Sequence, residues 1–152
     1  MSVNFQSPDL AQHAPRSVRC RLGGYVILPR MLDKCRAELA GKNGEYHYNC
    51  PMDQHFLTFA GIDAEALKAE VATGKGDWDI LQWIQSHSKS PRTAFEIHQW
   101  SEFHLHRGPD SDAETLAYFA KMVATHSQVR EDIQTWADVL DLDDYCSFGG
   151  RA

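Results

Sequence analysis

Residues 44–56 place two tyrosines, two histidines, a cysteine, an asparagine and an aspartate within one short segment. Cys50 directly precedes Pro51, so we expect it at the start of a helix, where amide dipoles favour a thiolate. His47 and Asp53 are close enough in sequence to act as a base and its orienting group. The segment therefore makes Cys50 a candidate nucleophile, with His47 as its candidate base. The favoured interpretation, which describes most buried free cysteines, is a Cys50 that packs as a small apolar residue.

A second group of residues has the donors and charges that a small anionic molecule needs. Tyrosine and asparagine offer directional hydrogen bonds, and arginine binds carboxylate or phosphate through two parallel bonds. We therefore predict a ligand pocket between the first helix and residues 44–56. The residues expected to bind the ligand are Arg16, Tyr25, Arg30, Tyr46, Tyr48, Asn49 and Asp53. The alternative is that the tyrosines fill the core and hydrogen-bond the backbone of an irregular loop.

The histidines do not predict a metal site. His98, Glu102 and His106 follow one another at intervals of four residues, so a helix aligns them in one row. That row spans about 12 Å, which is too long for one ion to touch all three side chains. None of the four cysteines forms a C-x-x-C pair, which argues against structural zinc. We expect a solvated polar face here, and no metal or cofactor.

Charge is unevenly distributed along the 152 residues, whose net charge is −6. Residues 1–44 contain seven basic and three acidic side chains, whereas residues 45–152 contain eight basic and eighteen acidic ones. The favoured interpretation is that the basic part lies across the acidic remainder of its own fold. The alternative is an anion site built from Arg16, Arg19, Arg21 and Arg30. The acidic total argues against nucleic acid as a partner.

The sequence shows no targeting or membrane segment. Its first residues lack the basic and apolar regions of a signal peptide. No apolar run approaches the roughly 20 residues that a membrane span needs. We therefore expect a cytoplasmic protein with reduced thiols and no membrane partner. A homodimer is compatible with the sequence, because Trp83 lies off the main apolar stripe of its helix, whereas Trp78 is expected in the core.

The pattern of apolar residues predicts an all-α fold: a compact bundle of about six or seven short helices in a single domain, residues 1–152. Residues 1–24 are expected to form an irregular arm, and residues 42–51 an irregular loop that carries the candidate site. The last helix is expected over about 132–144, followed by an irregular tail. The caps or first residues of the expected helices are Leu28, Pro51, Asp63, Asp77, Thr93, Ser111 and Asp132.

Two separated segments carry a family resemblance. They contain Gly23-Gly24-Tyr25, Leu28-Pro29-Arg30 and Asp33-Lys34, and then Gly44-Glu45-Tyr46-x-Tyr48-Asn49-Cys50-Pro51. With these motifs the chain resembles a bacterial domain-of-unknown-function family, from about Arg16 to Gly149. The resemblance implies a short, single-domain helical protein. The family brings no known catalytic residues, so it assigns no role to any side chain.

Two classes of function follow from these observations. The first is a small ligand-binding protein or enzyme whose pocket lies between the first helix and residues 44–56. The second is a non-catalytic interaction or regulatory module that binds another protein through an exposed helical face. So many polar groups in one loop favour the first class, because a bundle that only needs packing has little use for them.

Overall fold

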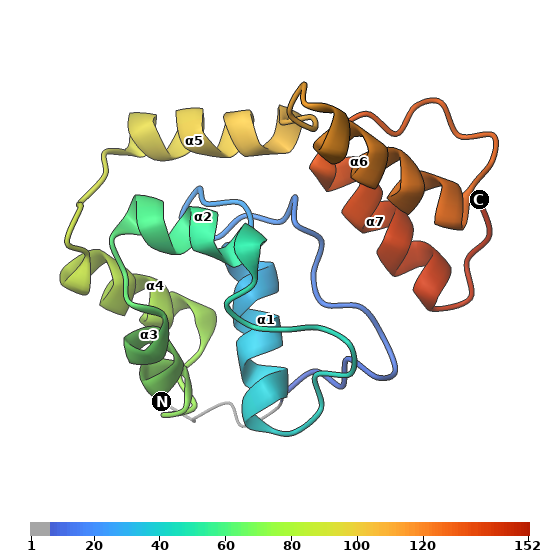
Figure 1. Ribbon diagram of the computed structural model, residues 1–152. Coiled ribbons are helices and arrows are strands. Elements are labelled where there is room, and N and C mark those ends of the chain that lie inside the picture. The colour runs from blue at the N-terminus through green and yellow to red at the C-terminus, as the bar shows by residue number, and fades with distance from the viewer. Residues whose placement is uncertain (1–6) are drawn as a thin grey trace.

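The computed structural model describes residues 7–152 and confirms the all-α fold, with no strand in that range (Figure 1). Its helices are α1 (Leu28–Leu39), α2 (Pro51–Ala60), α3 (Ala64–Val71), α4 (Asp77–His87), α5 (Ala94–His106), α6 (Ala113–His126) and α7 (Trp136–Ser147). Residues 7–27 and 42–50 are irregular, as the prolines and glycines predict. No helix within residues 7–152 has both the length and the apolar character needed to cross a membrane.

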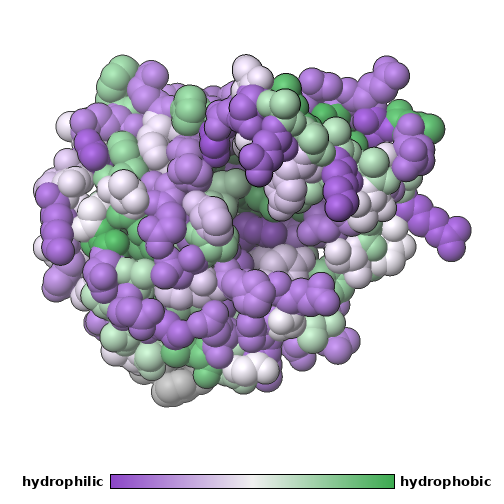
Figure 2. Space-filling model, in the orientation of Figure 1, coloured by the Kyte–Doolittle hydropathy of each residue, from purple (hydrophilic) through white to green (hydrophobic). Residues whose placement is uncertain are grey.

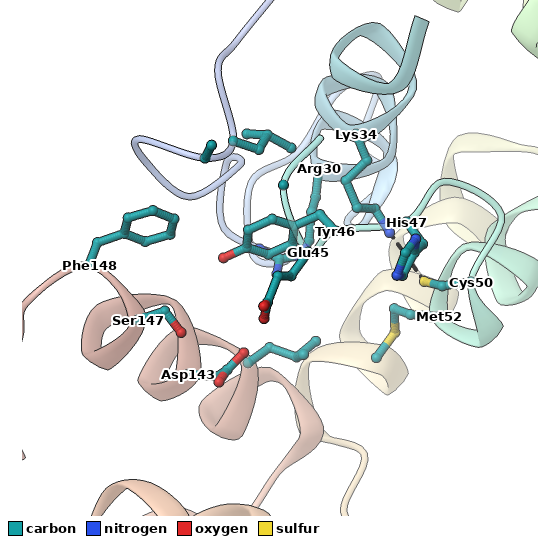
Figure 3. A pocket seen from close by; sticks show the side chains of 14 residues that line it. Arg30, Lys34, Glu45, Tyr46, His47, Cys50, Met52, Asp143, Ser147 and Phe148 are labelled. Carbon is teal, nitrogen blue, oxygen red and sulfur yellow. Dashed lines mark hydrogen bonds between the residues drawn. The ribbon is translucent and has the colours of Figure 1, made fainter. Parts of the chain in front are cut away.

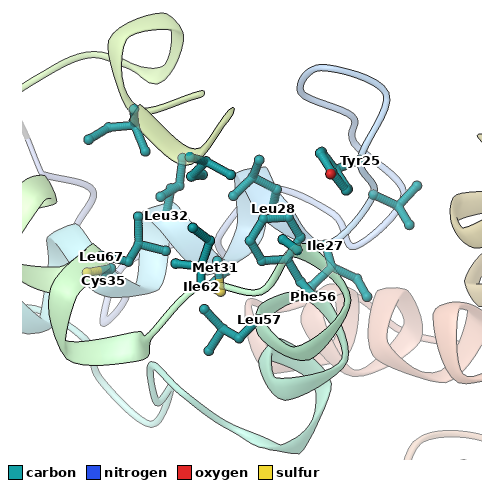
Figure 4. Close-up of a cluster of buried hydrophobic side chains, with 14 of the residues drawn as sticks. Tyr25, Ile27, Leu28, Met31, Leu32, Cys35, Phe56, Leu57, Ile62 and Leu67 are labelled. Carbon is teal, nitrogen blue, oxygen red and sulfur yellow. The ribbon is translucent and has the colours of Figure 1, made fainter. Parts of the chain in front are cut away.

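Helix α1 lies at the centre of the main hydrophobic core. Leu28, Met31 and Leu32 are fully buried, and they recur at the spacing that places residues on one helical face. Figure 4 shows these side chains meeting Phe56 of α2 and Leu67 of α3. Each such side chain contributes roughly 1.5–3 kcal/mol by leaving water. The burial therefore fixes α1 firmly, and residues on its other face are held in place with it.

The turn into α1 is unusual because its central residue, Ile27, has a positive φ of 72°. The Leu28 amide donates to the Val26 carbonyl at 2.8 Å, which closes a tight γ-turn. A β-branched residue avoids this conformation, so the surroundings must compensate for the strain. Ile27 is fully buried, and its amide donates to the Val18 carbonyl at 3.0 Å. The core contact therefore accounts for an isoleucine where backbone preference favours glycine.

Some expected helix starts are correct and others are wrong. Thr93 and Glu96 form the expected capping box of α5. The cap of α6 is Asp112 rather than Ser111, because the Asp112 carboxylate accepts the Thr115 amide at 2.8 Å. The cap of α4 is Gly76 rather than Asp77. The Asp77 carboxylate instead accepts hydrogen bonds from Arg16 and Arg36.

The last helix begins four residues later than the sequence predicts and also ends later. Thr135 and Asp138 form a capping box at its start. Asp132, the expected cap, instead binds Arg130 in the preceding loop. Helix α7 continues to Ser147, so the expected irregular tail is helical for three residues. Helices α6 and α7 pack against each other around a smaller apolar cluster that includes Phe119 and Val139 (Figure 1).

Salt bridges hold the basic arm to the acidic remainder of the chain, which confirms the favoured interpretation of the charge pattern. Arg16 binds Asp33 and Asp77, and Arg19 binds two aspartates of α7. Arg21 binds Glu102 of α5. The alternative, an anion site made by four arginines, loses support, because Arg16, Arg19, Arg21 and Arg30 each bind carboxylates of the chain.

The expected roles of two tryptophans are reversed. Trp83 packs against the main core and stacks on His87 with ring centroids 4.5 Å apart. Trp78, expected in the core, is 66% exposed. Their positions in α4 explain this, because the buried face carries Ile80, Leu81 and Ile84 and Trp78 lies in the first turn.

Candidate functional site

A cavity of about 670 Å³ lies between α1, residues 44–52 and α7. This is the size of a typical small-molecule site. Its wall includes Leu10 from the arm, Lys34 from α1 and Phe148 after α7. Figure 2 shows that the molecule is hollowed on this face between the part that holds α2 and the part that holds α7. Thus the cavity lies where the sequence predicts a pocket, with α7 as an additional wall.

The sulfur of Cys50 lies at one end of the cavity, beside a positive charge. Cys50 is the N-cap of α2, with extended backbone angles of −74° and 170°. The Lys34 ammonium donates a hydrogen bond to its Sγ at 3.1 Å. Figure 3 shows His47 and Met52 at the same end of the cavity. The sulfur therefore lies beside both the N-terminus of α2 and the Lys34 ammonium.

Lys34 is held in place by a buried carboxylate behind the cavity wall. Its ammonium lies 2.8 Å from Oδ1 of Asp53, which is fully buried. The second oxygen of Asp53 accepts the backbone amide of Asn49 at 2.9 Å. Burial raises the pKa of Asp53, and the Lys34 charge and the amide hydrogen bonds oppose that rise. The pair fixes the ammonium at the thiol while leaving no free charge behind it.

The Arg30 guanidinium is committed to α7 rather than free for a ligand. It binds both oxygens of Asp144, at 2.6 and 3.0 Å, in a buried ion pair. The Tyr46 hydroxyl donates to the same carboxylate at 2.8 Å. Burial and this hydrogen bond raise the pKa of Tyr46, so it remains a phenol at neutral pH. The three side chains thus join α1, the loop and α7 along one wall of the cavity.

The structure brings together four of the predicted site residues and places the others elsewhere. Those on the cavity wall are Arg30, Tyr46, His47 and Cys50. Those that do not line the cavity are Arg16, Tyr25, Tyr48, Asn49 and Asp53.

Each of these outlying residues has a structural contact that explains its position. Tyr25 packs edge-on against Phe56 in the core, with ring centroids 5.0 Å apart. The Tyr48 hydroxyl donates to the Ala64 carbonyl at 2.7 Å. Asn49 has a positive φ of 62° and an exposed side chain that accepts from Gln54.

Four charged residues around the cavity were missed at the sequence level: Lys34, Glu45, Asp143 and Asp144. One signal was present, because Lys34 follows Arg30 by four residues and therefore shares its helical face. Two cations on one face of a helix that is buried in the core require buried partners. The identity of those partners was not readable, since many carboxylates follow in the sequence.

A second cluster of titratable groups joins α2 to α5, outside the cavity. The rings of His55 and His104 lie 4.9 Å apart, and Arg107 contacts His55 Nε2 at 3.1 Å. Burial, together with the neighbouring His55 and Arg107, lowers the pKa of His104 from 6.5 to about 4. Burial and Arg107 also lower the pKa of His55. Both imidazoles are therefore neutral at pH 7 in the folded protein.

This cluster predicts a loss of stability in mild acid. Between pH 6.5 and 4 the unfolded chain protonates His104 while the folded chain does not, so the free energy of unfolding falls as pH is lowered through that window. We expect a contribution of about 2 kcal/mol after allowing for partial exposure. In urea unfolding, the free energy of unfolding should fall less between pH 7 and pH 4.5 for His104→Gln than for the parent protein. His106→Gln, at an exposed position of the same helix, should lose as much as the parent; equal losses in all three proteins contradict the assignment.

The row of His98, Glu102 and His106 does not form a cluster that could hold a metal ion. Within residues 7–152, no three histidine, cysteine, aspartate or glutamate side chains are grouped so that they could hold an ion. Glu102, the central member of the expected row, binds Arg21 and lies 3.9 Å from His106.

A family model described as a domain of unknown function (DUF5069) matches residues 12–146. The match contains α1 to α6 entirely and all of α7 except its last residue. It confirms the resemblance to a domain-of-unknown-function family that the two sequence segments indicate. No curated protein matches the sequence.

Proposed function

We propose that this chain, which belongs to the DUF5069 family of domains of unknown function, binds a small molecule in the cavity between α1, residues 44–52 and α7. One observation carries the proposal. The Cys50 thiol lies on the cavity wall at the N-terminus of α2, with the Lys34 ammonium 3.1 Å from its sulfur. Reactive cysteines occupy electropositive, partly exposed environments of this kind.

The buried pair behind Cys50 supports the proposal. Taking Lys34 and Asp53 out of water costs several kcal/mol per ion, and well-packed apolar residues of similar size are often equally stable. The pair is therefore a weak source of stability. It does hold an ammonium at a thiol that faces a cavity, which is an arrangement that function explains and packing does not.

The chemistry available is that of a cysteine sulfur with an ammonium beside it. Such a sulfur attacks an acyl carbon or a disulfide, and His47 is placed on the same wall as a candidate base. Either a catalyst or a binding protein fits this arrangement. A small anionic ligand, which the arginines suggest, has less support because Arg16 and Arg30 bind carboxylates of the chain.

Alkylation with iodoacetamide at pH 7 tests the thiol. We expect Cys50, which lies on the cavity wall beside an ammonium, to react faster than the exposed Cys20. It should react at least about tenfold faster than the buried Cys35. Burial raises the pKa of Cys35 to about 12, so its protection reports an intact fold. Peptide mass mapping gives the three rates in one sample.

The matched variant Lys34→Gln separates the effect of the ammonium on the alkylation rate from the effect of solvent exposure. It should slow alkylation of Cys50 while leaving Cys20 unchanged and Cys35 protected. A Cys50 that reacts no faster than Cys35 in the parent protein removes the proposal.

We infer a cytoplasmic setting for this function. The four cysteines are all free, and reduced thiols persist in the cytoplasm. The net charge of −6 supports a small molecule rather than nucleic acid as the partner.

The second candidate, a non-catalytic interaction module, is supported by apolar side chains on two helices. Phe95 and Phe103 of α5 are 71% and 61% exposed, and Tyr118 of α6 is 59% exposed. Scattered exposed aromatics are common, and a homodimer or another protein could cover them. An unreactive Cys50 favours this candidate.

A further inference from the structure

We infer that the ligand of this cavity carries a positive charge, an amine or guanidinium group held between Glu45 and Asp143. The inference rests on the proposed function and names the class of molecule that the cavity takes. It differs from the anionic ligand that the sequence suggests, because the structure accounts for the charges on the cavity wall one by one.

The arginine and the lysine on the cavity wall each already bind a carboxylate of the chain. Arg30 forms two hydrogen bonds with the buried carboxylate of Asp144, and Lys34 lies 2.8 Å from the buried carboxylate of Asp53. Each pair is held within the protein, where charges attract one another more strongly than in water. An anion in the cavity therefore meets two cations that each already bind a carboxylate, rather than two free cations.

The carboxylates on the wall are not neutralised in the same way. Glu45 is exposed, and no cation among residues 7–152 lies within ion-pair distance of it. Nε2 of His126 lies 2.7 Å from Oδ1 of Asp143, and no lysine or arginine among residues 7–152 forms an ion pair with this carboxylate. Figure 3 shows both carboxylates directed toward the middle of the cavity, one from the loop and one from α7.

The surroundings of the two carboxylates suit an organic cation. Tyr46, Leu140 and Phe148 add aromatic and apolar surface to the same cavity wall. An aromatic face attracts an alkylammonium or guanidinium, and the apolar wall covers its carbon chain. Cys50 lies at the far end from Phe148 (Figure 3), so a ligand anchored by its cation extends toward the thiol.

Three symmetrical disulfides of matched length test the inference: cystamine, which is cationic, 3,3′-dithiodipropionate, which is anionic, and bis(2-hydroxyethyl) disulfide, which is neutral. The Cys50 thiolate attacks one sulfur, the reagent's S–S bond breaks, and one half leaves as a thiolate while a mixed disulfide forms on Cys50. The reagent is the oxidant, so the step needs no other co-reactant. For each reagent, the rate at Cys50 in the folded protein is divided by the rate at Cys50 in the protein unfolded in urea. This ratio removes differences in the intrinsic reactivity of the three reagents.

We expect cystamine to modify Cys50 about five- to tenfold faster than the anionic reagent in dilute buffer, the order of magnitude that charges a few ångströms apart predict. This preference should shrink in about 0.5 M salt, because salt screens those charges. Glu45→Gln and Asp143→Asn should each lower the preference at least about twofold, as the loss of one of two charges implies. Glu131 is exposed in the loop before α7, away from the cavity. The control variant Glu131→Gln removes one negative charge there and should leave the preference for cystamine unchanged. Cys20, whose neighbours Arg19 and Arg21 both bind carboxylates, should show no comparable preference in the same sample.

The outcomes separate the two proposals. Equal rates for the three reagents at a reactive Cys50 overturn the cationic ligand and leave the thiol site in place. A faster anionic reagent also overturns it and favours the anion that the arginines suggest. A Cys50 that reacts with none of the reagents, while Cys20 does, removes the proposed function and this inference with it.

Discussion

Replacing Asp53 with alanine is expected to lower the free energy of unfolding by about 3–5 kcal/mol. Asp53 is fully buried, and its carboxylate is the partner of the Lys34 ammonium, which is itself only 4% exposed. The variant leaves that ammonium buried without a countercharge and also leaves the Asn49 amide without its acceptor. Urea unfolding followed by circular dichroism at pH 7 measures the loss.

A double variant separates the pair from the packing around it. Lys34→Met together with Asp53→Leu removes both charges and keeps apolar volume, so it should recover most of the lost stability. The same double variant should lose the fast alkylation of Cys50. A single Asp53→Ala loss below about 1 kcal/mol, the size expected of an exposed pair, contradicts the buried assignment.

The replacement Asp144→Ala is expected to have an effect of similar size, about 3–5 kcal/mol, at the junction of α1 and α7. It leaves the buried Arg30 guanidinium without two hydrogen bonds and the Tyr46 hydroxyl without its acceptor. Because Asp144 ties α7 to α1, amides of α7 should exchange with solvent faster in the variant. Hydrogen exchange read by mass spectrometry gives this together with the unfolding curve.

Asp141→Asn is the matched control on the same helix. Asp141 binds Ser17 and Arg19, and the Arg19 side chain is 41% exposed. An ion pair with that exposure is worth about 0–1 kcal/mol. If Asp141→Asn costs as much as Asp144→Ala, burial is not what makes the Arg30 pair important.

Local signals explain how much of the fold was predictable. Helix α2 begins at Pro51 and ends before Gly61, as expected. Proline fits the first turn of a helix, and glycine adopts the left-handed conformation, here with a φ of 64°. The start of α5 was also predictable, because the capping box of Thr93 joins residues only three positions apart. The start of α7 was not, because Asp132 and Thr135 are both good caps and only the contacts of Asp132 with Arg130 decide between them.

The site was predictable in part. Cys50 and Tyr46 share a short segment, so sequence alone placed them near each other, and both line the cavity. The role of Arg30 was not readable, because its partner lies 114 residues away and several aspartates surround Asp144. Which carboxylate meets which guanidinium depends on how α7 packs, and no local pattern encodes that. The predicted anion ligand depended on arginines being free, which tertiary structure decides.

The pairing of Arg30 with Asp144 also has a consequence for how the protein is made. A ribosome adds about 5–20 residues each second, so Arg30 emerges several seconds before the carboxylate 114 residues later that will neutralise it. Until then α1 can collapse onto α2 and α3, but its guanidinium must stay hydrated. The nascent chain therefore acquires its apolar core early and its ligand-binding wall only when α7 arrives. A chain interrupted before α7 would hold Cys50 in an open groove, with its thiol exposed to cellular oxidants.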